Sequence, residues 1–345
     1  NAPRKERIGS AHGTTTRSEC TGTHGLRQVT RVLALHDGGA GNARQANALA
    51  RALAPDDAGE CVLQPSLAAR RFAPRTWPLL SDPFGQSFRA ECEHPPHIAI
   101  GCGRQAALAT RLLRKRGSKA VQVLDPRIDT RHWDLLVAPE HDGLRGDNVI
   151  AMLGSLHPVD DQWLGQARRD AAHLSVLPGP HTVLLVGGPT RHAVLDDAGF
   201  VALVRDLREQ ALAEGGSFSA VASRRTPTHW RDAMVEGDSS LPGLRWRDDR
   251  DGANPYSGLL AHADRIVCTP DSVNMLSEAA ATLAPVFVWS PQVVQGRPRH
   301  FLDDVLASGR VRVLDDTLAP FAVEPLRETA RVADEVRRRI GFTLD

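Results

Sequence analysis

Residues 29–45 read VTRVLALHDGGAGNARQ, and this stretch decides the fold class. The apolar run from Val29 to Leu35 predicts a buried strand, the glycines after it predict a tight turn, and a helix is expected through Gln45 to Leu53. Apolar runs alternate with amphipathic stretches along the rest of the chain, which is typical of repeated β-α units around a mostly parallel sheet. Further strands are expected at 97–100, 120–124, 135–138, 182–186, 219–222, 266–269 and 286–289, and a charged helix at 324–340.

Length and composition indicate a packed protein with two domains. The chain has 345 residues, whereas a single core usually serves about 150. Hydrophobic residues make up 41% and charged residues 24%, values of globular proteins that exclude a disordered or fibrous class. The net charge of +1 gives no chain-wide attraction to nucleic acid, so we expect no nucleic-acid partner and only local anion sites.

The cysteines and the apolar stretches bear on the cellular compartment. Five cysteines without a CxxC pair argue against a disulfide framework or a zinc site, and fit a reducing cytoplasm. No apolar stretch approaches the ~20 residues that cross a bilayer. A peripheral contact of Trp77, Leu79 and Leu80 with lipid, near several arginines, is compatible with the sequence, but a loop packed on the first domain is the favoured interpretation.

Domain boundaries follow from turn-forming residues. Residues 1–27 are polar and rich in Gly, Thr and Ser, so a disordered tail is expected there. Leu177-Pro178-Gly179-Pro180 resists both helix and strand and is the predicted hinge. We therefore expect a Rossmann-like domain at 28–178, a second at 179–323 and a final helical segment at 324–345.

Ligands of doubly wound sheets bind beyond the carboxyl ends of the strands, so the loops there are the candidate site. In the first half, Gly38 and Gly41 allow close approach of a ligand, and Arg104 at a helix start suggests an anion. Asp37 and His36 are the candidate bases, with His141 in reserve. Each of these residues is also explained by an ordinary turn, a solvated arginine or a hydrogen-bonded histidine.

The second half carries the stronger anion signals. Gly187-Gly188 offers bare amides after a strand, and Ser223-Arg224-Arg225-Thr226 places hydroxyls beside two guanidinium groups. Asp271 or Ser272 is a natural N-cap, which leaves helix amides pointing from the sheet edge. Glu278 lies about two turns further, where a carboxylate can accept from a ribose diol. A structural arginine pair and simple capping remain the alternatives.

These residues together resemble the mitochondrial-fission (elongated mitochondria) family of plants and proteobacteria. The matching stretches span roughly 29–313 and are Asp37–Gln45, Gly103–Gln105, Gln122–Pro126, His141-Asp142, Gly187-Gly188, Ser223–Pro227, Asn254–Tyr256 and Asp271–Ala279. The resemblance implies a B-type glycosyltransferase fold, with two Rossmann-like domains facing across a cleft and a final helix that crosses back. It also implies that Glu278 holds the ribose, that Gly187, Gly188 and Ser272 face the diphosphate, and that Asn254 lines the cleft. The family often has histidine in place of Asn42 and a small hydroxyl residue in place of His36, so a His36 base does not follow from it.

Three functions are compatible with this pattern. The first is a cytoplasmic, bacterial, metal-independent glycosyltransferase, with a nucleoside diphosphate sugar as ligand on the second domain, an unspecified acceptor on the first, and no tightly bound cofactor. The second is a nucleoside-diphosphate-sugar epimerase on the same fold. The third is a non-catalytic interaction protein, because fold alone does not fix function.

Overall fold

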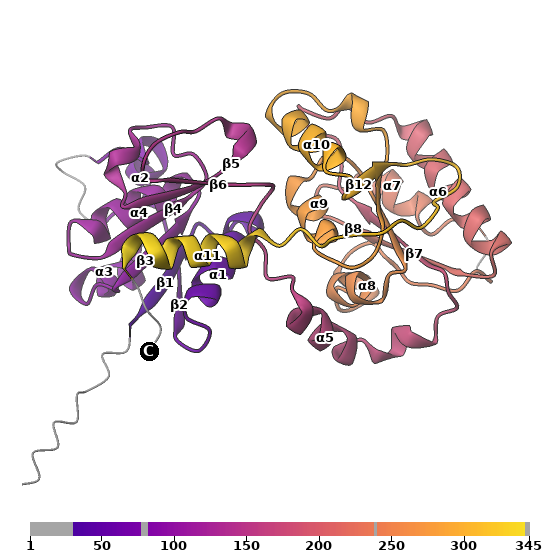
Figure 1. Ribbon diagram of the computed structural model, residues 1–345, viewed down its shortest axis with the longest axis horizontal. Helices are drawn as coiled ribbons and strands as arrows, with labels where there is room; N and C mark the ends of the chain where they lie inside the picture. The colour runs from indigo at the N-terminus through magenta and orange to yellow at the C-terminus, as the bar shows by residue number, and fades with distance from the viewer. Residues whose placement is uncertain (1–29, 77–81, 238–239, 342–345) are drawn as a thin grey trace, which may run out of the picture.

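The structure is a computed structural model that describes residues 30–76, 82–237 and 240–341. The predicted tail at 1–27 and the side chains of Trp77, Leu79 and Leu80 lie outside these residues. Two parallel β-sheets, each flanked by helices, lie side by side along the long axis of the molecule (Figure 1). The predicted fold class, α/β with two facing Rossmann-like domains, is confirmed.

The first sheet has six parallel strands in the order β2-β1-β3-β4-β5-β6. From β1 the chain moves outward to β2 and then returns to β3 on the other side of β1, so β1 and β3 flank the switch point where such sheets bind ligands. Val32 pairs with Ile98 in this register. The strands are β1 (Val32–His36), β2 (Ala58–Val62), β3 (Ile98–Cys102), β4 (Lys119–Val123), β5 (Leu135–Pro139) and β6 (Val149–Met152).

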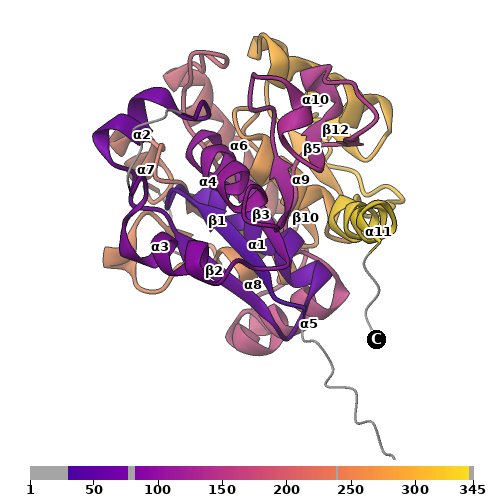
Figure 2. The same cartoon turned by 90° about the vertical axis from the view of Figure 1, so that its left-hand side faces the viewer.

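Helices cover both faces of this sheet, which explains why its inner strands are mostly apolar. One face is buried under α1 and α11, and the other under α3 and α4. Figure 2 looks along the long axis and shows α2 and α3 on one side of the sheet and α11 on the other. The helices are α1 (Ala40–Leu53), α2 (Leu67–Phe72), α3 (Gly85–Glu93), α4 (Arg104–Arg114), α11 (Glu328–Ile340) and the short turns η1 (Thr130–His132) and η2 (Glu140–Asp142).

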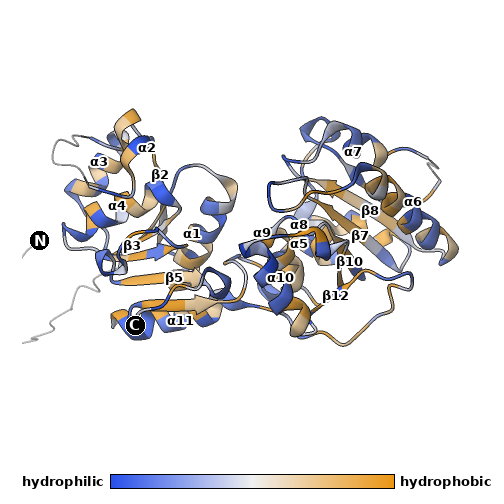
Figure 3. Cartoon of the chain, turned by 90° about the horizontal axis from the view of Figure 1, so that it is seen from above, coloured by the Kyte–Doolittle hydropathy of each residue, from blue (hydrophilic) through white to orange (hydrophobic). Residues whose placement is uncertain are grey.

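The second sheet repeats the arrangement with the order β12-β11-β10-β7-β8-β9. Here β7 and β10 flank the switch point, with Val183 paired to Ile266. The strands carry the apolar residues of the core, while the outer helices are mostly hydrophilic (Figure 3). The strands are β7 (His181–Val186), β8 (Ser217–Ala222), β9 (Arg245–Trp246), β10 (Arg265–Cys268), β11 (Val286–Val288) and β12 (Val311–Val313).

The helices of the second domain follow the same alternation. Phe200 of α6 stacks on Trp230 of α7 with ring centroids 4.0 Å apart, which fixes these two helices against each other. The elements are α6 (Asp197–Ala213), α7 (Thr228–Ala233), α8 (Tyr256–His262), α9 (Val273–Ala280), α10 (Arg297–Ala307), η3 (Ala172–Val176), η4 (Asp249–Asp251) and η5 (Pro291–Val293).

The chain passes between the domains twice. Helix α5 (Asp161–Asp170) packs on α8 of the second domain, so the first passage lies before α5 and not at the predicted boundary of residue 178. The prolines at 178 and 180 instead precede β7 within the second domain. The second passage leads to α11, which packs on α1 and β6. The two passages are tied together where the His157 amide donates to Thr329 Oγ1 at 3.0 Å.

Candidate functional site

A cleft of about 540 Å³ lies between the domains, where the carboxyl edges of the two sheets meet. The start of α1 forms its first-domain wall. The loop after β8, the end of β9 and the starts of α8 and α9 form most of its second-domain wall. The lining residues are Ala40, Gly41, Arg44, Trp163, Val221, Ala222, Ser223, Arg224, Arg225, Trp246, Asn254, Tyr256, Ser257, Ser272, Asn274, Met275 and Glu278. The structure thus brings together Ser223, Arg224, Arg225, Ser272 and Glu278, which the sequence analysis placed at one ligand.

The loop after β8 is fixed by its own hydroxyl groups. Thr226 is buried, donates Oγ1 to the Gly187 carbonyl at 2.6 Å and accepts from the Ser223 amide at 2.8 Å. Ser223 Oγ in turn accepts from the Arg225 amide at 3.2 Å. Thr226 was predicted to bind phosphate, but its hydroxyl is fully used inside the loop, so this prediction is corrected to a structural role.

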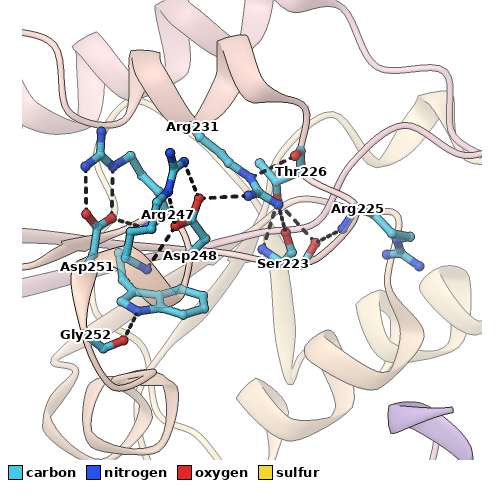
Figure 4. A network of polar contacts seen from close by, with 10 residues as sticks. Ser223, Arg225, Thr226, Arg231, Arg247, Asp248, Asp251 and Gly252 are labelled. Atoms are coloured by element: carbon cyan, nitrogen blue, oxygen red, sulfur yellow. Dashed lines mark hydrogen bonds and ion pairs between the residues drawn. The ribbon is translucent and has the colours of Figure 1, made fainter. Parts of the chain in front are cut away.

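Arg231 of α7 supports the same loop from outside the cleft. Its guanidinium donates to the carbonyls of Ser223 and Thr226, each at 3.0 Å, and pairs with Asp248 at 3.4 Å. Figure 4 shows Arg231 and Asp248 on one side of Ser223 and Thr226, and the Arg225 side chain pointing to the opposite side. These contacts hold the backbone of the loop on two sides, whereas the Arg224 and Arg225 side chains are exposed.

Asp271 joins three loops of the second domain. Its side chain is fully buried and accepts from the Gly188 amide at 3.1 Å, from Thr269 Oγ1 at 2.7 Å and from Arg225 Nη2 at 2.5 Å. The Gly187 amide donates to Thr269 Oγ1 at 2.8 Å. The prediction that the amides of Gly187 and Gly188 are free to bind a ligand is therefore wrong, because both donate to groups of the protein. Asp271 holds these loops together but does not itself line the cleft.

These two glycines are needed for close packing. A Cβ atom on Gly187 would lie 2.2 Å from the Asp271 carboxylate, and one on Gly188 would lie 2.3 Å from the Arg225 carbonyl oxygen. Any larger residue at either position would force the three loops apart. The close approach that these glycines allow is therefore that of neighbouring loops of the protein.

Helix α9 begins at the cleft. Ser272 is its N-cap, with Oγ accepting from the Met275 amide at 3.4 Å, and the first turn of the helix opens toward the cleft. The positive end of the helix dipole favours an anion at this place. Glu278 follows within the same helix, and its side chain is only 2% exposed.

Glu278 is bound by an arginine from the opposite domain. Arg44 Nη1 of α1 lies 2.5 Å from both carboxylate oxygens. The Arg44 guanidinium also lies over the Tyr256 ring, 5.6 Å from its centroid. Burial lowers the pKa of Arg44, but the Glu278 carboxylate outweighs this effect and the net direction is upward. Burial and the same carboxylate raise the pKa of Tyr256 well above its ordinary value.

His36 does not have the environment of a general base. It is 2% exposed, its Nε2 lies 2.6 Å from Glu60 Oε1, and its Nδ1 accepts from the Gly38 amide at 3.1 Å. Both ring nitrogens are therefore occupied in a structural contact between β1 and β2. Hydrogen bonds from Asn47 and then from His36 lower the pKa of Glu60, which keeps this partner ionised. The prediction of a His36 base is corrected accordingly.

Asp37 is exposed at the start of α1. Its Oδ1 accepts from the Gly39 amide and from Asn42 Nδ2, each at 3.1 Å, which forms a local turn. Asp37 and Gly38 do not line the cleft, but Ala40 and Gly41 immediately after them do. Of the predicted bases, Asp37 is the one that stays accessible near the cleft.

Two other first-domain candidates lie away from the cleft lining. His141 packs on Phe301 of α10 with ring centroids 5.9 Å apart, and burial lowers its pKa. Arg104 is exposed and donates to the carbonyl of Arg70. The position of His141 does not fit a reserve base in the cleft, and that of Arg104 does not fit an anion contact there. Asn254 does line the cleft, and its Oδ1 accepts from the Tyr256 amide at 2.9 Å.

Sequence reasoning missed several lining residues. Arg44 was passed over as one of many arginines, although it follows the lining residue Gly41 by three positions and so shares its helix face. Trp163 and Trp246 give the cleft an aromatic part, and neither lies in a motif after an apolar run. Over the residues that the structure describes, no cluster of three His, Cys, Asp or Glu is placed to hold a metal. Within the same residues, no helix has the length and apolarity to cross a membrane.

Comparisons with known proteins place this geometry in a family. The mitochondrial fission protein ELM1 of Arabidopsis thaliana is 27% identical over 278 residues, covering 71% of this chain and 64% of that protein. The chain therefore spans less than two thirds of this relative. An uncharacterised protein of Rickettsia prowazekii (strain Madrid E) is 22% identical, covering 70% of this chain and 79% of that protein.

Solved structures share the fold at low sequence identity. UDP-GlcNAc 2-epimerase from Methanocaldococcus jannaschii is 12% identical, with a TM-score of 0.55 and coverage of 89% of this chain and 99% of that chain. The predicted two-domain arrangement is confirmed by this likeness. The family model described as mitochondrial fission ELM1 matches residues 40–340, which include the whole cleft lining. The chain belongs to the mitochondrial fission ELM1 family.

Proposed function

We propose that this protein binds a nucleoside diphosphate sugar in the interdomain cleft and acts as a metal-independent glycosyltransferase. The observation that carries the proposal is the charge of the cleft. Three arginines, Arg44, Arg224 and Arg225, line it together with the first turn of α9, whereas Glu278 is the one carboxylate among its described lining residues. Such a site favours an anion with several oxygens, as a diphosphate has.

The parts of the ligand fit different walls of the cleft. Arg224 is exposed and Arg225 is half exposed, so both can turn toward phosphate oxygens, although Arg225 would share its charge with Asp271. Glu278 lies inside the same helix whose start would hold the diphosphate, which suits hydrogen bonds from ribose hydroxyls. The aromatic rings of Trp163 and Trp246 offer apolar surface to a nucleobase.

In a transferase, the cations and the α9 dipole would stabilise the departing diphosphate. Asp37 would take the proton of the acceptor hydroxyl, since it is exposed beside the first-domain wall of the cleft. An epimerase needs both an acid and a base around the sugar, whereas a transferase needs one base. Asp37 is one such group beside the wall, and the described lining adds no histidine and only a carboxylate already bound to Arg44. The geometry therefore favours transfer over epimerisation.

The same scarcity of acid-base groups favours a second candidate, a protein that binds the nucleotide without turnover. The two are separated by incubating the protein with a radiolabelled nucleoside diphosphate sugar and a set of hydroxyl-bearing acceptors, with water as the acceptor of last resort, and measuring transfer of the sugar together with release of the diphosphate. Release that Asp37→Asn abolishes supports the transferase. Binding without release supports the second candidate.

Calorimetry with the diphosphates of adenosine, guanosine, cytidine and uridine tests the binding itself. We expect millimolar or tighter affinity for at least one of them, and a loss of about tenfold in Arg224→Ala, the effect of one charge-assisted hydrogen bond. Arg205→Ala is the matched control, because Arg205 is also exposed but lies on α6 away from the cleft. Flat titrations with all four diphosphates would refute the proposal.

A further inference from the structure

The contact between Arg44 and Glu278 is the shortest ionic link between the two sides of the cleft. All hydrogen bonds and ring contacts described for the Arg44 side chain go to the second domain, to Glu278 and to Tyr256. The Glu278 side chain is 2% exposed, whereas that of Arg44 is 46% exposed. The carboxylate is therefore held in place, and the arginine is the partner that can leave.

The two helix starts are also in direct contact beside this pair. A Cβ atom on Gly41 would lie 2.7 Å from Asn274 Nδ2, so the glycine lets α1 approach α9 closely. Arg44 is one turn further along α1 and reaches Glu278 because of this approach. The pair is thus part of the domain contact and not a chance meeting of long side chains.

A ribose diol and Arg44 require the same atoms. Arg44 Nη1 engages both oxygens of Glu278, and hydroxyl groups that donate to this carboxylate would have to replace it. A displaced Arg44 remains in a cleft that would then contain a diphosphate, the strongest available acceptor for a guanidinium group. The exchange gives the guanidinium group a second anionic partner, and the ribose hydroxyls that donate to Glu278 keep the buried carboxylate hydrogen-bonded.

We propose that Arg44 is an exchange residue, which neutralises Glu278 in this structure and passes to the phosphate oxygens when a nucleotide takes the carboxylate with its ribose. This inference rests on the proposed nucleotide site and adds to it a first-domain residue that couples ligand binding to the contact between the domains. Arg44 then opposes binding of the ribose and favours binding of the phosphates.

The exchange predicts opposite effects on two classes of ligand. Arg44→Met keeps an unbranched apolar side chain and removes the guanidinium group. A nucleoside then no longer competes with Arg44 for Glu278, and its affinity should rise about threefold to tenfold. A nucleoside diphosphate gains the same access to Glu278 but loses a charge-assisted contact between Arg44 and its phosphates that is worth more, so its affinity should fall about threefold or more. A residue that only supports the fold would shift both affinities in the same direction.

The experiment is calorimetry with uridine, adenosine, guanosine and cytidine and with their diphosphates, on the full chain. Arg44→Lys keeps the charge and guards against poor folding of Arg44→Met, and it should retain part of the preference for diphosphate. Arg51→Met is the control, since Arg51 is exposed on the last turn of the same helix.

Three outcomes are decisive. Opposite shifts in Arg44→Met, absent in Arg51→Met, support the exchange. A diphosphate that binds the wild-type protein with an unchanged ratio of the two affinities in Arg44→Met overturns the exchange and leaves the proposed function intact. A wild-type protein that binds neither class overturns both.

Discussion

Replacement of Asp271 by alanine tests whether the loops around the cleft depend on one buried carboxylate. The substitution removes the acceptor of the Gly188 amide, of Thr269 Oγ1 and of Arg225. A buried amide left without an acceptor costs about 1–3 kcal/mol. The lost pair with Arg225 adds less than a fully buried pair would, because the Arg225 side chain is 50% exposed. We therefore expect a total loss of about 2–4 kcal/mol in the second domain.

The assay is thermal unfolding followed by tryptophan fluorescence. For a domain of this size the loss corresponds to a fall in Tm of roughly 4–16 °C. Asp206→Ala is the control, since the Asp206 carboxylate is 62% exposed on α6 and its loss should leave the Tm unchanged. If Asp271→Ala unfolds at the same temperature as Asp206→Ala, the three-loop network does not stabilise the protein and the reasoning is refuted.

Other predictions concern the first passage between the domains and the loop after β8. Burial lowers the pKa of His157 to about 4 from an ordinary 6.5. The unfolded chain therefore takes up a proton first as pH falls, and stability should decline from about pH 6.5 to about pH 4. In Tm measurements over this pH range, His157→Gln should flatten the decline. Gly154→Ala should lower the Tm more than Gly117→Ala, because both have positive φ but only the first would place a Cβ atom against Ser277 Oγ, at 2.4 Å; equal shifts would contradict this. Arg231→Ala should weaken diphosphate binding several-fold in calorimetry by loosening the loop it supports, and an unchanged affinity would show that the loop keeps its shape without it.

The inner strands of both domains were predictable because helices bury both of their faces. The expected strand at 182–186 is found at His181–Val186, and that at 219–222 at Ser217–Ala222. The four edge strands, β2, β6, β9 and β12, were missed. In β12 two of three residues are exposed, and β2 has one buried residue, so neither shows a continuous apolar run.

The edge that carries the site was also predictable, because parallel strands end on the same side and a turn follows each one. The sequence did not predict which atoms of this edge face the cleft. The Gly188 amide is taken by Asp271, 83 positions away, and Glu278 by Arg44, 234 positions away. A local motif shows a donor or an acceptor but not the distant group that satisfies it. For the same reason a buried His36 paired with Glu60 was read as a base.

The position of α11 affects the order in which the protein can be completed during synthesis. Val332, Ala333 and Val336 of this last helix are buried against the first sheet and α1, although the rest of that domain is translated well before them. The second domain is therefore synthesised before α11 can cover the apolar face that α1 and β6 form. Until α11 has been synthesised, that face stays exposed to chaperones and to other nascent chains.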